Sequence, residues 1–246
     1  MSRENSEIIP LGGFAIQSTS SKHLADQLQE NMAHQQTTLL FANTNFIVKC
    51  QPQKSALTNS NTLIVNDGVG IDIATWLIHK KKFRENLNGT DFTPFFLQQL
   101  GADAKVFLLG AKPGIAQRAA QRLQEELKIQ VVGYRNGYDE ARDTQALVET
   151  INNSGANVVL VAMGNPYQEQ WIIQHRTQLQ ANVLIGVGAL LDFLAGDKPR
   201  APQIFQRLRL EWFYRLCLEP SRLLRRYTVD IIVFLQLCLR QGKSLS

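Results

Sequence analysis

The stretch Thr62–Gly70, with the sequence TLIVNDGVG, joins a short apolar run to an acidic residue and two glycines. A continuous run of aliphatic residues is typical of a strand buried on both faces, because a half-buried strand alternates apolar and polar residues. We therefore expect a strand over Thr62–Asn66 and a turn from Asp67. Five similar runs predict further strands: Thr38–Ala42, Lys105–Leu109, Gln130–Gly133, Asn157–Ala162 and Val183–Val187.

Helical patterns lie between these apolar runs. We expect helices at Asp72–Lys82, Asp91–Leu100, Pro113–Leu127, Glu140–Asn153 and Tyr167–Leu179. Pro113 suits the first turn of its helix, where the backbone N–H has no intrahelical partner in any case. Alternation of strands and helices over about 190 residues predicts an α/β, Rossmann-like fold with a largely parallel sheet and flanking helices.

The positive charge of the chain is concentrated near its C-terminus. From Asp197 onward there are ten Lys and Arg against four Asp and Glu, whereas residues 1–196 have sixteen against seventeen. From Pro202 only helical patterns follow. We therefore expect a polar N-terminal lead (1–20), an α/β domain (21–200) and a basic, amphipathic helical appendage (201–246). A neutral body with a basic, aromatic-rich tail indicates an anionic partner, which is a membrane surface, a phosphorylated ligand or both.

Three features bear on the cellular setting. The segment Met1–Pro10 is polar and acidic, unlike the basic and then apolar start of a signal peptide. Cys50, Cys217 and Cys238 are odd in number and widely spaced, which favours a reducing compartment over a disulfide framework. The longest apolar run, Ile231–Leu239, is too short to cross a hydrocarbon core of about 30 Å at about 1.5 Å per residue. We expect a protein that lies on a membrane without spanning it.

Ligands of open parallel sheets bind beyond the carboxyl ends of the strands. The loops expected there are Asn43–Asn45, Asp67–Gly70, Gly110–Gly114, Gly164–Glu169 and Gly186–Gly188. Four of these five loops contain glycine, which lets backbone amides approach a phosphate closely, and a helix N-terminus favours negative charge. Each glycine taken alone is equally consistent with a tight turn. A shared ligand site is indicated if all five loops meet at one edge.

Several common sites are not matched by the sequence. A dinucleotide site requires a third glycine after Gly68 and Gly70 or after Gly186 and Gly188, and Ile73 and Leu191 stand there instead. There is no Walker loop, no G-x-S-x-G and no Asp-x-Asp. The histidines are scattered, at His23, His34, His79 and His175. We therefore expect neither a metal ion nor a cofactor.

Asp67 is the best single candidate for chemistry. It follows a strand that is expected to be buried and precedes Gly68 and Gly70, so its carboxylate should project into the loop edge with little competing bulk. A carboxylate placed there can act as a general base on a hydroxyl group. The alternative is that Asp67 only caps the following helix through its side chain.

Seven motifs stand in order along the chain: Asn66–Gly70, Asn88–Asp91, Gly110–Pro113, Ala162–Glu169, Gly186–Ala189, Arg200–Pro202 and Glu211–Arg215. In this combination the sequence strongly resembles the WecG/TagA/CpsF family of bacterial glycosyltransferases over about residues 10–230. The resemblance implies an inverting, metal-independent transfer of a hexose-type sugar from a UDP-sugar to a polyprenyl-diphosphate-linked saccharide, in cell-surface polysaccharide synthesis. Relatives use N-acetylmannosamine, its uronic acid or glucose. The resemblance also implies a peripheral location on the cytoplasmic face of the inner membrane, whose surface is anionic.

The resemblance implies roles for particular residues in the α/β domain, which would be the catalytic domain. Asp67 matches the family's proposed catalytic base, and Asn43 and Gln168 match substrate-site residues. The loop glycines would also bind substrate: Gly68, Gly110, Gly164 and Gly186.

Arginines of the tail complete the site that the resemblance implies. Arg215, Arg222 and Arg225 match tail arginines that would fold over the site and face the diphosphate, for which guanidinium groups are well suited. Their spacing of i, i+7 and i+10 predicts one face of a helix, although Pro220 is able to interrupt that helix.

Two departures and two other classes of function limit this reading. Many members have Thr where this chain has Phe41, and Arg where it has Asn86, so we expect altered contacts to the donor sugar.

A non-catalytic protein that binds anionic membranes is one alternative function, and nucleic-acid binding by the tail is the other. No recognised nucleic-acid module is present in the sequence, so we expect no nucleic-acid partner. The oligomeric state is left open, a homo-oligomer included.

Overall fold

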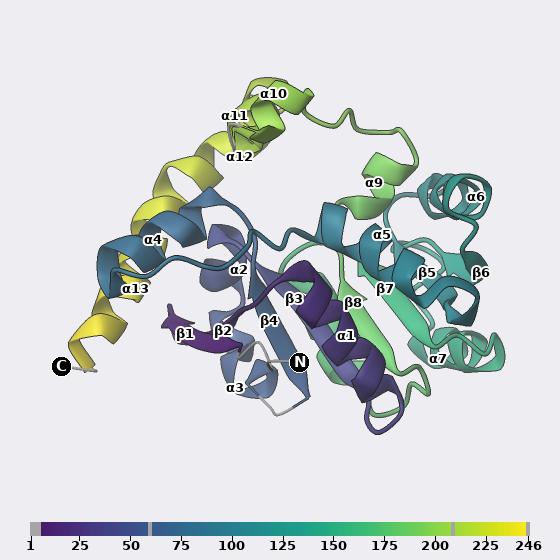
Figure 1. Cartoon of the computed structure of the whole chain (residues 1–246). Coiled ribbons are helices and arrows are strands. Elements are labelled where there is room, and N and C mark those ends of the chain that lie inside the picture. Colours follow the sequence, from purple (N-terminus) through teal and green to yellow (C-terminus); the bar gives the residue numbers. More distant parts are fainter. Residues whose placement is uncertain (1–5, 59–60, 208–209, 245–246) are drawn as a thin grey trace.

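The computed structural model describes residues 6–58, 61–207 and 210–244, which form one eight-stranded sheet between helices (Figure 1). The strand order is β1-β2-β4-β3-β8-β7-β5-β6, and all neighbours are parallel except β1 and β2. The strands are β1 (Glu7–Leu11), β2 (Phe14–Ser18), β3 (Thr37–Ala42), β4 (Thr62–Asn66), β5 (Lys105–Gly110), β6 (Gln130–Arg135), β7 (Val158–Ala162) and β8 (Val183–Gly186). The predicted α/β fold with a largely parallel sheet is confirmed.

All six strands expected from the sequence are present, with ends shifted by up to two residues. The reading of the N-terminal lead as merely polar missed the hairpin of β1 and β2. The available signal was Gly12-Gly13 between two short apolar runs. Both glycines have positive φ, of 59° and 88°, as a type I′ two-residue hairpin turn requires. Ile9 and Ile16 pair across this hairpin, and both side chains are buried.

The helices of the α/β domain are α1 (Ser21–Met32), α2 (Thr44–Lys49), α3 (Lys54–Leu57), α4 (Val69–His79), α5 (Gly89–Leu100), α6 (Ile115–Leu127), α7 (Thr144–Asn153), α8 (Tyr167–His175) and α9 (Leu190–Leu194), with short 3-10 turns at Gln51–Gln53 and Gly101–Asp103. The five expected helices are present as α4 to α8, but the sequence reading missed α1, α2, α3 and α9. The expectation that Pro113 lies in the first turn of α6 is wrong. Gly114, with φ of 81°, is the N-cap, so Pro113 precedes the helix.

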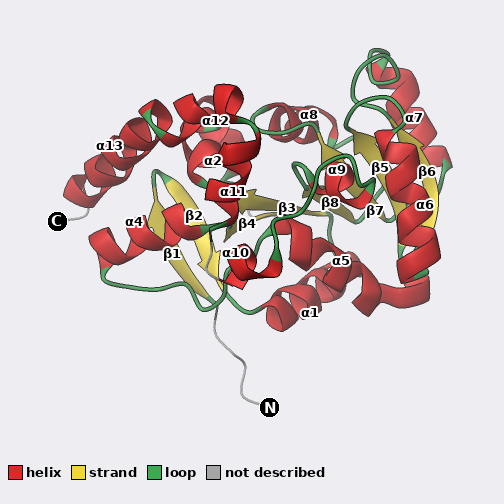
Figure 2. Ribbon diagram, turned by 90° about the horizontal axis from the view of Figure 1, so that it is seen from above, coloured by secondary structure: helices red, strands yellow, loops and turns green. Residues whose placement is uncertain are grey.

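Each face of the sheet is covered by a different set of helices (Figure 2). Strand β3 shows this division, because Leu39 and Phe41 join one hydrophobic cluster and Leu40 and Ala42 join the other. Helices α1, α5, α6 and α9 supply the first cluster, and α2, α4, α7, α8 and the C-terminal α13 supply the second. Alternation along a strand that is apolar at every position therefore divides the core into two layers.

The C-terminal part consists of α10 (Gln203–Arg207), α11 (Glu211–Leu218), α12 (Pro220–Tyr227) and α13 (Val229–Ser244). The chain crosses from α9 to the other end of the sheet, and α13 then packs on α2 and α4 (Figure 1). The prediction that three arginines share one helix face is wrong, because α11 ends before Glu219 and a new helix starts at Pro220. Within the described ranges, the chain has no helix of the length and apolarity that crossing a membrane requires.

Candidate active site

The end of β3 and the end of β4 bring Asn43 and Asp67 together. The two strands are adjacent and parallel, with Ala42 opposite Asn66, and the Asp67 N–H donates to the Ala42 carbonyl at 2.8 Å. Asn43 is the N-cap of α2, where its Oδ1 accepts from the backbone N–H of Phe46 at 3.1 Å. Its amide nitrogen is thereby turned toward Asp67 and donates to Oδ2 at 3.2 Å. The helix cap thus orients the amide that holds the carboxylate.

The backbone after Asp67 leaves its surroundings open. Gly68 has φ of 94°, a conformation that favours glycine, and its N–H donates to Oδ1 of Asn86 at 2.7 Å. A Cβ at Gly68 would meet no atom within 4 Å. The N-cap of α4 is Gly68 itself, so the alternative that Asp67 acts as the cap of this helix is not what the structure has.

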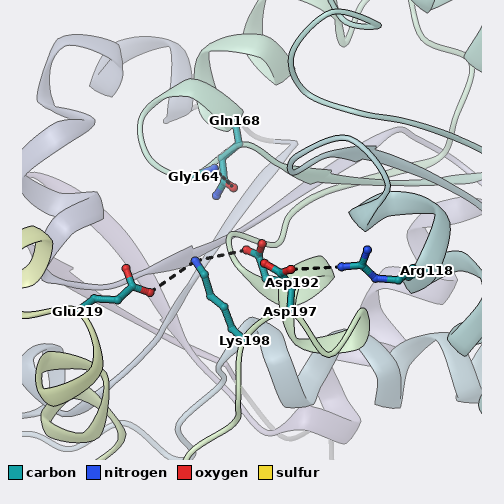
Figure 3. A network of polar contacts seen from close by, with 7 residues as sticks. All are labelled: Arg118, Gly164, Gln168, Asp192, Asp197, Lys198 and Glu219. Carbon is teal, nitrogen blue, oxygen red and sulfur yellow. Dashed lines mark hydrogen bonds and ion pairs between the residues drawn. The ribbon is translucent and has the colours of Figure 1, made fainter.

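Gln168 connects the loops after β7 and β8, and Figure 3 shows its side chain near Gly164. Its Oε1 accepts from the N–H groups of Gly164 at 3.2 Å and of Gly188 at 3.0 Å. The side chain is 3% exposed, and a Cβ at Gly186 would lie 3.0 Å from its Nε2. Gln168 therefore stands at the predicted edge, but its amide oxygen is already used to hold two loops.

Glu169 is a buried acid that the sequence reading did not single out. Its Oε1 accepts from Asn165 Nδ2 at 2.7 Å and from Gln168 Nε2 at 2.8 Å. Burial raises the pKa of the Glu169 carboxyl, and the hydrogen bonds from the two amides act in the opposite direction. Burial also raises the pKa of the neighbouring Cys50 thiol, and the Glu169 carboxyl adds to this shift. The available signal was its place in the Gly164–Glu169 motif, directly after Gln168.

Gly110 ends β5 next to these loops. Its φ is 125°, and a Cβ there would lie 2.3 Å from the Ala162 carbonyl oxygen, so only glycine fits beside β7. The five strands that precede the expected ligand loops are consecutive in the sheet, in the order β4-β3-β8-β7-β5. Because they are parallel, their carboxyl ends lie at one edge. The condition for a shared ligand site is met.

The first turn of α11 lies over this edge. Burial raises the pKa of Glu211, the positive charges of Arg215 and Arg200 lower it, and the negative charges of Asp91 and Asp67 raise it further. Glu211 is therefore close enough to interact with Asp67, although the two residues are separated by more than half of the chain. The sequence reading named Glu211 only as part of a motif, and its position is set entirely by the path of the tail.

Ion pairs hold the segment that leads into the tail, and the start of α12, against the body. Lys198 Nζ lies 3.7 Å from Asp192 Oδ2 in α9 and 3.8 Å from Glu219 Oε1 at the start of α12 (Figure 3). Arg118 of α6 pairs with Asp197 at 3.2 Å, as the same view shows, and Arg200 pairs with Asp91 of α5.

The three predicted tail arginines have different surroundings. The Arg215 guanidinium stacks on the Phe193 ring, 4.8 Å from its centroid, and its charge acts on Glu211 beside the site. Arg225 is exposed on α12. Arg222 belongs to the same helix, and its side chain lies outside the described part of the structure. Among the described side chains of the three predicted arginines, Arg215 is the one that interacts with residues beside the sheet edge, namely Phe193 and Glu211.

The two residues that depart from the family pattern, Phe41 and Asn86, lie in different parts of the fold. Phe41 is 6% exposed and packs in the core, with its ring 6.1 Å from that of Phe92 and against Gly89. Asn86 instead contacts the Asp67 loop through Gly68. In the described residues, no group of three or more His, Cys, Asp or Glu is arranged to hold a metal ion.

A largely parallel sheet whose glycine loops, amides and carboxylate meet at one edge is typical of an α/β protein with a ligand site beyond the carboxyl ends of its strands. The chain belongs to the glycosyl transferase WecG/TagA/CpsF family, whose model matches residues 9–246. The resemblance seen in the sequence is therefore confirmed, and the protein is a glycosyltransferase. A purely non-catalytic role is set aside.

Two similar proteins come from Staphylococcus aureus strains NCTC 8325 / PS 47 and COL. Each is named N-acetylglucosaminyldiphosphoundecaprenol N-acetyl-beta-D-mannosaminyltransferase. Each is 29% identical over 238 residues, which cover 94% of this chain and 93% of the relative.

Proposed function

We propose that this glycosyltransferase moves a hexose-type sugar from a UDP-sugar to a polyprenyl-diphosphate-linked saccharide in the synthesis of a cell-surface polysaccharide. The name of the staphylococcal relatives favours N-acetylmannosamine as the donor sugar and a lipid-linked N-acetylglucosamine as the acceptor. N-acetylmannosaminuronic acid and glucose are the other donors to test. The observation that carries the proposal is the pair Asn43 and Asp67, joined at 3.2 Å beside the open Gly68.

Asp67 acts as the general base in this proposal. Its carboxylate takes the proton of the acceptor hydroxyl group while the hydroxyl oxygen attacks the anomeric carbon of the donor. The new C–O bond forms as the bond from that carbon to the diphosphate oxygen breaks, and UDP leaves with the electron pair. Attack from the face opposite UDP inverts the anomeric configuration. Asn43 keeps the carboxylate in position through its amide N–H.

The charge of the diphosphate is offset by protein groups in this mechanism. The first turns of the helices that follow β3, β4 and β7 begin at the same edge, and helix N-termini favour anions. Arg215 reaches the edge from α11 and is suited to charge-assisted hydrogen bonds with phosphate oxygens. We propose that these groups replace a divalent cation.

The acceptor determines where the enzyme works. A polyprenyl diphosphate is held in a bilayer, so the enzyme must reach its diphosphate at the membrane surface. We propose a peripheral location on the cytoplasmic face of the inner membrane, with the basic C-terminal helices attracted to anionic lipids at about 1 kcal/mol per basic residue near the surface.

A donor screen tests this function. Purified protein is incubated with polyprenyl-diphosphate N-acetylglucosamine and, in turn, the UDP derivatives of N-acetylmannosamine, N-acetylmannosaminuronic acid and glucose. We expect one donor to give a lipid-linked disaccharide by mass spectrometry, with stoichiometric release of UDP. Absence of product from all three donors, with a protein that is folded by circular dichroism, would contradict the proposal.

A further inference from the structure

Helix α4 has two apolar faces. Ile71, Ala74 and Thr75 are buried on its inner face. On the opposite face, Ile73, Trp76 and Leu77 are 51%, 49% and 48% exposed. These three positions follow the i, i+3, i+4 spacing of a single helix face. A surface helix normally carries polar residues there, so this outward stripe needs a partner.

Helix α13 has the same two-sided character. Asp230, Phe234 and Cys238, at intervals of four residues, are buried toward the body. Ile232, Leu235 and Leu239 follow an i, i+3, i+7 spacing on the other side and are 59%, 37% and 59% exposed. The tail helix therefore anchors itself to the domain with one stripe and leaves a second apolar stripe uncovered.

The two helices are in contact, and both views place them at the same end of the molecule, beyond β1 and β2 (Figures 1 and 2). Their outward stripes therefore lie on helices that touch each other, and the two stripes together are called here the α4–α13 surface. It consists of Ile73, Trp76 and Leu77 of α4 and Ile232, Leu235 and Leu239 of α13.

The charges beside this surface favour an anionic bilayer over a second copy of the chain. Helix α4 ends at three consecutive lysines, Lys80–Lys82, all of them exposed. Lys80 Nζ lies 5.0 Å from the centroid of the Trp76 ring, and Lys81 pairs with Glu7. Arg240 is exposed near the end of α13. Tryptophan next to lysine is typical of a membrane–water interface, whereas self-association would bring like charges together.

We propose that the α4–α13 surface enters the interface of an anionic bilayer, so that the α/β domain itself contacts the membrane through α4. This inference rests on the proposed function, because it supplies the geometry for a lipid-linked acceptor. Helix α4 begins two residues after Asp67. Docking through α4 therefore fixes how the catalytic edge faces the lipid surface, which attachment by a tail alone would not do.

Vesicle binding of a triple variant tests the inference. Replacing Ile73, Trp76 and Leu77 by serine removes the α4 stripe while leaving the buried face unchanged. We expect partitioning onto phosphatidylglycerol-containing vesicles to weaken by about tenfold or more, because interfacial binding scales with the apolar area inserted. The matched control carries Tyr134→Ser and Tyr138→Ser, which change two exposed aromatics near the far edge strand, β6. Unchanged partitioning of the triple variant would overturn the proposal.

Turnover distinguishes this inference from the proposed function. With a short-chain, water-soluble acceptor the triple variant should keep wild-type activity, and with the acceptor embedded in vesicles it should lose about tenfold or more. Loss of activity on the soluble acceptor with unaltered vesicle binding would contradict the role of α4. Absence of wild-type activity on both acceptors would instead reject the proposed function and leave the binding result to decide the membrane surface.

Fluorescence reports whether Trp76 itself enters the lipid. Vesicles with brominated acyl chains quench tryptophans that insert, and the difference between wild type and Trp76→Phe isolates the contribution of Trp76. We expect strong quenching of that component. Bound protein without this component of quenching would mean that the tail alone attaches. A change in Trp76 emission that depends on protein concentration and needs no vesicles would mean self-association, and would equally overturn the proposal.

Discussion

The sheet edge and the C-terminal helices contribute to the candidate active site in different ways. At the edge, Asn43 and Asp67 are held by hydrogen bonds between neighbouring strands, and Gln168 is almost fully buried. Helices α11 and α12 are held over that edge by partly exposed ion pairs of Lys198, at 3.7 and 3.8 Å, and by the stacking of Arg215 on Phe193, whereas α13 is anchored by buried side chains such as Phe234. Exposed ion pairs contribute about 0–1 kcal/mol each, so the contacts of α11 and α12 open at a lower free-energy cost than those of the edge.

This difference assigns separate tasks to the two regions. The edge is formed before substrate arrives, as a catalytic base requires. Helix α11 adds the positive charge of Arg215, and its weaker attachment is compatible with entry of a lipid-linked acceptor. Substitutions at the edge should therefore lower the rate of the chemical step, whereas changes in the tail should act on binding of the diphosphate and of the membrane.

The largest effect is expected at Asp67. Asp67→Asn removes the general base and should lower turnover by about 10²-fold or more while leaving donor binding and the fold intact. Steady-state kinetics and calorimetric titration with the UDP-sugar measure the two quantities. Asp103→Asn is the matched control, because Asp103 is exposed and belongs to the turn before β5 rather than to a loop of the edge. A variant that keeps more than half of wild-type turnover would leave Asp67 without a catalytic role.

Removal of the tail should have the next largest effect. A chain that ends at Arg200 is expected to fold but to be largely inactive on a lipid-linked acceptor. It should also be less stable, because burial of one side chain such as Phe234 against the domain contributes about 1.5–3 kcal/mol. Full-length Phe234→Ala, which should lose about 3–5 kcal/mol of stability, separates loss of stability from loss of closure. Full turnover of the shortened chain would refute a closing role for the tail.

Arg215→Ala should lower activity by about tenfold or more through weaker diphosphate recognition. Vesicle binding should change little, since one arginine is a small part of the surface attraction. Arg122→Ala, on the exposed side of α6, controls for the loss of a positive charge. Equal activities of the Arg215→Ala and Arg122→Ala variants would contradict a role for Arg215 in diphosphate recognition.

A smaller effect is expected at Glu169, and it depends on pH. Because burial raises its pKa in the folded state, the carboxyl favours folding at low pH, and this contribution is lost as the pH rises from about 4.3 toward the raised value. The wild type should therefore lose stability relative to Glu169→Gln over that range. Urea unfolding of both proteins from pH 4 to pH 8 gives the difference, and a constant difference would contradict the argument.

Chelation should have the smallest effect. Activity after exhaustive treatment with a chelator is expected to equal that before treatment, because arginines and helix N-termini are proposed to take the place of a cation. An activity that disappears and returns with Mg²⁺ or Mn²⁺ would show that the edge needs a metal ion to bind the diphosphate.

The sequence predicted the strands and helices that a run of neighbouring residues marks clearly, and it missed those with a weak or short pattern. The six apolar runs are strands, because a segment such as Val158–Ala162 is apolar at every position and has few other ways to be buried. The missed helix α1 has only three buried residues among polar ones, so its periodicity is weak. Helix α2 has six residues, too few to establish a period. The prediction that Arg215, Arg222 and Arg225 share one helix face was wrong because it assumed one continuous helix, whereas a new helix starts at Pro220.

The sequence by itself determined the α/β class, the family and the position of Asp67 at the end of a strand. Those properties depend on neighbours along the chain. The tertiary structure decided that Asn43 orients Asp67, that Gln168 holds two loops, and that Glu211 lies close to Asp67. It also brought α4 and α13, each with an outward apolar stripe, into contact. These relations depend on strand order and on the path of the tail, which join residues far apart in sequence, and no local pattern encodes such distances.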